Sequence, residues 1–234
     1  KKVRGNDAQF YLMEDMTQAL SIKNVSFVFE PKGFTVCDNS QEAGSWTANK
    51  EDSKNVQNGQ LYIMTSGNVT IEGCSFDKAM VTTFNCTGSS TVKDCSFANV
   101  YNSYAIKDIR GANVSVTGTT ITNCGGGIMV SSTDKVEKVT IWKNTFTNVD
   151  AAGTAAEEKV GTRALIQIAS TGDYSGTSFN LTANTATGCG PVLRQLNQTI
   201  VNSGKIDTVK SDVDGLVKSG TKGLGTTDSL LEQS

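Results

Sequence analysis

The sequence predicts an all-β solenoid, in which short strands coil into stacked and nearly identical turns. Two observations predict it: the composition favours strands and turns, and one short segment recurs along the chain with the same residue classes in the same positions. The 234 residues include 23 Gly, only two Pro, and many Thr, Ser, Asn and Val. A formal net charge of −2 and 37% hydrophobic residues predict a folded domain, not a disordered chain or a nucleic-acid-binding surface.

The recurring segment ends in an aromatic or aliphatic residue, which we call the anchor. VTIEGCSF and STVKDCSF, for example, both end in Cys-Ser-Phe, at Phe76 and Phe97. Successive anchors lie 21 to 25 residues apart, except where insertions at about residues 30–58 and 150–162 lengthen the interval. The anchors are Phe27, Phe76, Phe97, Ile121, Phe146 and Ala186.

A second segment recurs between the anchors and confirms the period. AQFYLM and GQLYIM nearly coincide, and MVTTFNC, SYAIKDI, GGIMVS, RALIQIA and PVLRQL follow in the later units. Each unit therefore contains three short strands, of the types NVTI, CSF and QLYIM. A β-sandwich also has short strands and turns, but it does not require the same residue class at the same position of each unit. Stacked coils about 4.8 Å apart do require it.

The position three residues before the anchor predicts a sharp bend. It holds Asn24, Gly73, Asp94 and Gly118, which are residue types that tolerate a left-handed backbone. Lys143 and Ala183 occupy it in the last two units, and this leaves open a different bend there.

The position two residues before the anchor holds compact side chains, which we expect inside the solenoid. They are Val25, Cys74, Cys95, Thr119, Asn144 and Asn184. The two asparagines predict a stacked amide ladder. Cys74 and Cys95 come within disulfide distance on neighbouring coils, but stacked side chains run parallel, so we expect buried free thiols.

The repeat, its columns and its turn residues resemble the right-handed, single-stranded parallel β-helix of the pectate-lyase-like superfamily. The resemblance covers about residues 8–205 and implies six to seven coils of three strands. We expect the β-helix to span residues 1–210 and a C-terminal cap or linker to span 211–234. Segments such as FVFEPKGFTVCDNS also look like β-helical modules of gut-bacterial surface proteins.

Both insertions fall at the same turn and are expected to flank one face, because long loops at one corner of a solenoid lie together. In the resembling superfamily, this corner and the strand that follows it border the saccharide cleft. Strand alternation predicts the outward residues of that strand, with a register that is uncertain by one residue. The candidates are Tyr62, Lys107 or Asp108, Arg110, Met129, Gln167 and Arg194.

These candidates are typical of a glycan-binding face. Tyr62, together with Trp46 on the first insertion, offers an aromatic surface to a sugar ring. Lys107, Arg110 and Arg194 offer partners for the carboxylates of an acidic polysaccharide, and Gln167 lies among them. In the plainer alternative, the cations only keep an exposed sheet soluble and Trp46 packs against its own loop.

Catalysis is less well supported by the residues. A hydrolase resembling polygalacturonase needs clustered aspartates and carries a histidine motif, whereas this chain has no His. A lyase needs a base, for which Lys107, Arg110 and Arg194 are weak candidates, and a calcium ion held by several acidic oxygens. Asp and Glu do not cluster on consecutive coils, so no metal site and no cofactor are predicted.

The sequence therefore predicts a secreted or cell-surface module that binds carbohydrate or serves as an adhesive or stalk segment. A polysaccharide lyase acting on an acidic glycan is the alternative, and a purely structural spacer is the third hypothesis. We expect a monomeric module of a longer extracellular protein, whose signal sequence is not in this chain. The expected partner is a polysaccharide or a cell-surface glycan, with no nucleic acid and no membrane span in this segment.

Overall fold

The computed structural model describes residues 9–13, 17–29, 59–84, 86–100, 103–150, 163–168 and 171–218. Trp46 and nearly all of the two predicted insertions lie outside the described residues.

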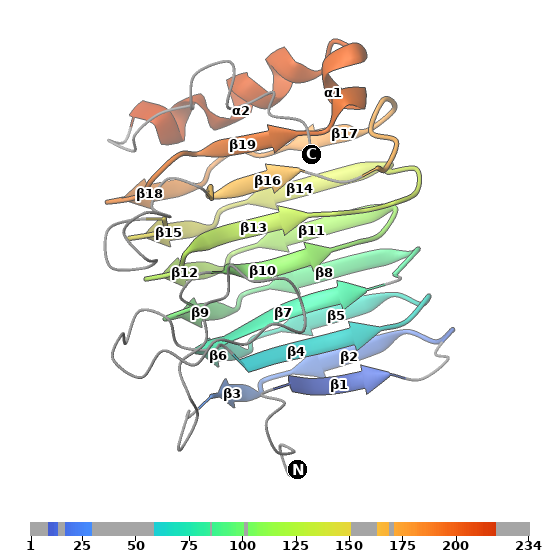
Figure 1. Cartoon of the computed structure of the whole chain (residues 1–234), viewed down its shortest axis with the longest axis vertical. Coiled ribbons are helices and arrows are strands. Elements are labelled where there is room, and N and C mark those ends of the chain that lie inside the picture. Colours follow the sequence, from blue (N-terminus) through green and yellow to red (C-terminus); the bar gives the residue numbers. More distant parts are fainter. Residues whose placement is uncertain are drawn as a thin grey trace, which may run out of the picture.

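Three parallel sheets form the body of the protein, and each coil contributes one strand to each sheet (Figure 1). Sheet A contains, in spatial order, β1 (Gln9–Met13), β4 (Gly59–Met64), β7 (Ala79–Phe84), β10 (Tyr104–Ile109), β13 (Gly126–Val130), β16 (Ile166–Ile168) and β19 (Leu193–Leu196). Sheet B contains β2 (Leu20–Lys23), β5 (Val69–Glu72), β8 (Ser89–Lys93), β11 (Asn113–Thr117), β14 (Lys138–Trp142) and β17 (Ser178–Asn180). Sheet C contains β3 (Ser26–Val28), β6 (Ser75–Asp77), β9 (Ser96–Ala98), β12 (Thr120–Thr122), β15 (Thr145–Thr147) and β18 (Thr185–Thr187).

The anchors form one continuous interior column of sheet C. Phe27, Phe76 and Phe97 pair in register, and their rings stack with centroids 4.8 and 4.4 Å apart. Ile121 and Phe146 continue the column and are fully buried. The predicted repeat is thus confirmed, and the buried column is the physical reason for it: each coil must cover the apolar side chains of its neighbours.

The bend between sheets B and C is the same in all six coils. The six residues at this position all have a left-handed backbone, with φ between 52° and 63°: Asn24, Gly73, Asp94, Gly118, Lys143 and Ala183. The different bend left open for Lys143 and Ala183 is wrong. Stacking imposes one path on every coil, so these two residues adopt a conformation that costs an ordinary residue about 1 kcal/mol.

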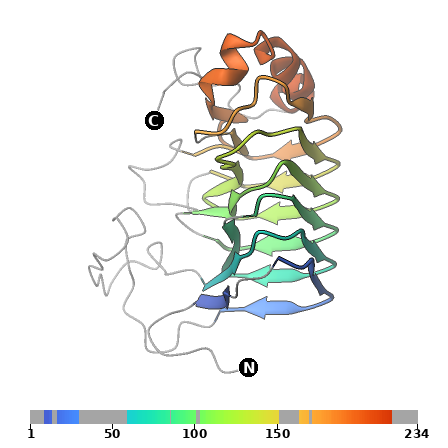
Figure 2. The same cartoon turned by 90° about the vertical axis from the view of Figure 1, so that its right-hand side faces the viewer.

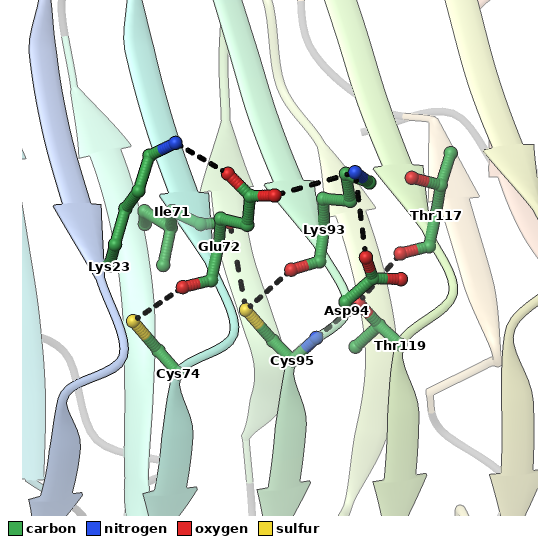
Figure 3. Close-up of polar contacts among 9 residues, drawn as sticks. All are labelled: Lys23, Ile71, Glu72, Cys74, Lys93, Asp94, Cys95, Thr117 and Thr119. Carbon is green, nitrogen blue, oxygen red and sulfur yellow. Dashed lines mark hydrogen bonds and ion pairs between the residues drawn. The ribbon is translucent and has the colours of Figure 1, made fainter.

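The small interior column behind this bend is held by hydrogen bonds between coils. The Thr119 N–H donates to Asn144 Oδ1, and the Asn144 N–H donates to Asn184 Oδ1, each at 2.9 Å. The predicted amide ladder is therefore confirmed. Cys74 and Cys95 lie side by side in the same column as free, buried thiols, as expected (Figure 3).

Two helices, α1 (Gln198–Asn202) and α2 (Ile206–Lys218), lie across the end of the stack that follows β19 (Figures 1 and 2). Val209, Val213 and Leu216 of α2 are buried, and Asp212 accepts a hydrogen bond from the backbone of Leu181. The helix spans the boundary expected at residue 210. Its apolar residues recur at helical spacing, a signal that the expectation of a cap or linker over 211–234 did not use.

Candidate functional site

Five of the outward residues predicted for sheet A stand in a single file across its strands. Tyr62 pairs with Thr82, Met129 pairs with Gln167, and Gln167 pairs with Arg194. Ile106 pairs with Val81 on one side and with Ile128 on the other, so Lys107 stands between Thr82 and Met129. The file thus contains Tyr62, Lys107, Met129, Gln167 and Arg194.

A bulge interrupts this file at β10. Two residues, Lys107 and Asp108, oppose the single residue Met129, and Asp108 has a left-handed backbone with φ of 54°. Both side chains are half-buried. The uncertainty between Lys107 and Asp108 in the sequence therefore has a structural cause, because a bulge gives two residues one place in the alternation.

Arg110 lies beyond the end of β10, at the turn toward sheet B. Its backbone N–H donates to Thr83 Oγ1 at 3.0 Å, and its carbonyl accepts a hydrogen bond from Ser90 Oγ. Thr83 and Ser90 are buried, so the backbone of Arg110 is fixed from the interior. Arg110 therefore lies at the end of β10 opposite to Tyr104 and does not belong to the file.

A buried tyrosine lies at the opposite edge of sheet A, where β10 begins. Tyr104, at the start of β10, is 6% exposed, and its hydroxyl is hydrogen-bonded to Gln167 Oε1 two strands away. Gln167 is also buried. Burial raises the pKa of Tyr104 well above its ordinary value, so the hydroxyl keeps its proton at neutral pH and donates to the Gln167 oxygen. Tyr104 thereby fixes the orientation of the Gln167 amide.

Charged side chains surround the Tyr104 hydroxyl. Arg163 and Arg194 lower the pKa of Tyr104 electrostatically and Asp150 raises it, which places one carboxylate and two guanidinium groups near this hydroxyl. Asp150 is 1% exposed, and its backbone N–H donates to the Cys124 carbonyl at 2.9 Å. We call Tyr104, Asp150, Arg163, Gln167 and Arg194 the tyrosine cluster.

Glycines make room for this cluster. A Cβ on Gly126 would lie 2.7 Å from a ring carbon of Tyr104, and a Cβ on Gly190 would lie 2.9 Å from Asp150 Oδ2. Gly126 and Gly127 begin strand β13, where the sequence repeat places the segment GGIMVS. The candidates taken from the sequence did not include Tyr104, Asp150 and Arg163. Glycine inside a strand often marks the close approach of another group, and that signal pointed to this site.

No group of three or more His, Cys, Asp or Glu side chains could hold a metal ion within the described part of the chain. In the same part, no helix is long and apolar enough to cross a membrane.

Three parallel sheets, similar coils and stacked interior columns define a parallel β-helix. The sequence matches the family described as the right-handed β-helix region over residues 33–193, and the chain belongs to this family. No curated protein and no solved structure shows a significant match to it.

Proposed function

We propose that this β-helix is a non-catalytic module of an extracellular or cell-surface protein, and that it binds an acidic polysaccharide on the outer face of sheet A. The observation that carries the proposal is the file from Lys107 to Arg194 together with the tyrosine cluster. Lys107, Arg163 and Arg194 bring three cations to sheet A, against the carboxylates of Asp108 and Asp150, and Arg110 adds a fourth at the adjoining turn. Such a face attracts a polymer of negative sugars.

The positions of these groups suit an extended ligand. Neighbouring strands of a sheet lie about 4.8 Å apart, so Lys107, Gln167 and Arg194 stand at multiples of this step along the solenoid axis. Gln167 is held by Tyr104 and lies next to Arg194, which gives this end of the file a rigid amide beside a guanidinium group. A guanidinium group binds a carboxylate through two parallel hydrogen bonds, and a fixed amide supplies directional contacts to sugar hydroxyls.

The test is electrophoresis of the protein through gels that contain polygalacturonate, alginate, or the same polymers with their carboxyl groups reduced to alcohols. We expect the acidic polymers to slow migration and the reduced polymers to slow it much less, with the difference shrinking as NaCl is added. Equal migration in all gels would contradict binding on this face. Release of unsaturated sugars from the acidic polymers would instead support the lyase alternative.

A further inference from the structure

A second surface, on sheet B, has a chemistry different from that of sheet A. Trp142, at the end of β14, is 37% exposed and is one of three large hydrophobic side chains that are exposed in the described residues. The other two, Val25 and Val28, belong to the first coil. Trp142 instead lies on the face of the sheet, in register with Thr117 of the preceding coil.

Hydroxyl groups lie beside this indole ring on β14 and β11. Thr140 precedes it by two residues on the same face of β14, and Ser115 and Thr117 stand beside them on β11. None of these three hydroxyl groups makes a side-chain hydrogen bond to another described residue. Thr91 and Thr70 extend the Ser115 position over two further strands. The surface is therefore an exposed aromatic ring beside a row of available hydroxyl groups.

On the first three coils, the outward charges at the end of sheet B are paired with one another. Lys23 and Lys93 contact Glu72 at 2.8 and 3.4 Å, and Lys93 also contacts Asp94 at 3.5 Å (Figure 3). The two lysines lower the pKa of Glu72, so this group stays ionised and keeps them paired. The charges of these coils therefore balance, which favours an uncharged ligand there, and Lys138 of β14 adds one exposed cation to the same face.

The ammonium group of Lys143 lies over the Trp142 ring, 4.1 Å from its centroid. The ring therefore has an outer face on which a cation already rests. The C–H groups on one side of a sugar ring carry a partial positive charge and stack on the same aromatic face. Lys143 and a sugar thus compete for one surface.

We propose that Trp142 is the platform of a second binding site, for a neutral polysaccharide of β-linked pyranose rings. One ring of the polymer replaces the Lys143 ammonium group on the indole. The hydroxyl groups of Thr117, Ser115 and Thr140 form hydrogen bonds with the hydroxyl groups of that sugar ring and of the next one. This site is separate from the function proposed for sheet A and does not depend on it.

The experiment is affinity electrophoresis in gels that contain hydroxyethylcellulose, arabinoxylan or galactomannan, which are soluble neutral polymers of β-linked pyranoses. We expect at least one of them to slow the wild-type protein. Trp142→Ala should weaken that interaction roughly tenfold, and Trp142→Phe should keep part of it, because a smaller ring still stacks. Arg194→Ala, on sheet A, should leave it unchanged.

The direction in which Lys143→Ala changes the affinity distinguishes stacking on Trp142 from charge-driven binding. Removing the competing cation–π contact should tighten binding to the neutral polymer about two- to fivefold. Trp46 and Trp142 are the only tryptophans, so in a Trp46→Phe protein the emission of Trp142 should shift to shorter wavelength as polymer is added.

The proposal is overturned if none of the three neutral polymers slows the protein, or if Trp142→Ala binds them as the wild type does. Weaker binding by Lys143→Ala would also overturn it, because the lysine would then be a ligand and not a competitor. Each of these results leaves the acidic-glycan function of sheet A standing, since that function is measured with charged polymers.

Discussion

Sheets B and C repeat from coil to coil throughout, whereas sheet A repeats in β1, β4 and β7 and then departs from the repeat. The strands of sheets B and C pair in register along their whole described length, as Val116 does with Val92 and Ile141. Sheet A instead has register shifts at β10 and β16, a left-handed residue within a strand, and a buried tyrosine that spans two strands. Repetition supplies the stability of the solenoid, and the departures from it coincide with the clustered polar groups.

This difference agrees with the general behaviour of folded sequences. In most of a protein, the conformation that the local sequence prefers agrees with the overall fold. The two conflict at sites that serve a function other than folding. If the account is correct, substitutions inside the regular columns should change stability, and substitutions on the outer face of sheet A should change binding.

The largest effect is expected for Phe97→Ala. Phe97 is 1% exposed and stacks on Phe76, so removing its ring should lower the free energy of unfolding by about 3–5 kcal/mol. Met129→Ala, on the outer face of sheet A, should cost about 1 kcal/mol or less, because this side chain is half-buried. Urea denaturation measures both free energies of unfolding. Equal losses in the two variants would contradict the view that the buried column of sheet C carries stability and the outer face of sheet A does not.

The interior thiols should make the solenoid sensitive to alkali. Burial raises the pKa of Cys124 from 9.0 to about 12. Between pH 9 and 12 the Cys124 thiol ionises in the unfolded chain but not in the folded chain. Its contribution to the free energy of unfolding is therefore fully present below pH 9 and is lost as the pH rises. From pH 8 to 10 this one group should cost on the order of 1 kcal/mol.

Cys124→Val removes the titrating group and keeps an apolar side chain. Its unfolding free energy should therefore fall less than that of the wild type over the same pH range. Parallel curves for the two proteins would show that Cys124 is not held protonated by the fold.

Ala183→Gly should stabilise the protein. Ala183 has φ of 58° at a position where earlier coils have Gly73 and Gly118, and glycine adopts this conformation without the steric cost. We expect a gain of about 0.5–1 kcal/mol, or roughly 2 °C in Tm. Ala186→Gly, at the buried anchor position, is the matched control and should destabilise. A loss of stability in Ala183→Gly would mean that the bend is not strained.

The smallest effect is expected on the exposed side of sheet B. Glu72→Gln breaks the contacts with Lys23 and Lys93, but these groups are exposed to solvent. We expect Tm to change by about 1 °C or less, with no dependence on salt. A clear, salt-dependent drop in calorimetry would mean that this charge ladder contributes to the register of the coils.

The fold was predictable because its information is local and repeated. Phe76 and Phe97 each set the position of a coil, and Cys74, Cys95, Thr119 and Asn144 form one column by spacing alone. The tyrosine cluster was not predictable in this way. Tyr104 and Gln167 are 63 residues apart and meet only because a glycine lets the ring cross β13. Helix α2 was missed because a solenoid repeat gives no rule for how its end is covered.

The most direct test of the account compares two variants that remove the same charge from different faces. Arg194→Ala removes a cation from the file on sheet A, and Lys138→Ala removes one from the exposed edge of β14 on sheet B. In titrations with oligogalacturonate, we predict that Arg194→Ala weakens binding about tenfold or more, because a charged hydrogen bond is lost, and that Lys138→Ala leaves it nearly unchanged. Equal loss in both variants would contradict a specific site on sheet A and would indicate that only net charge matters.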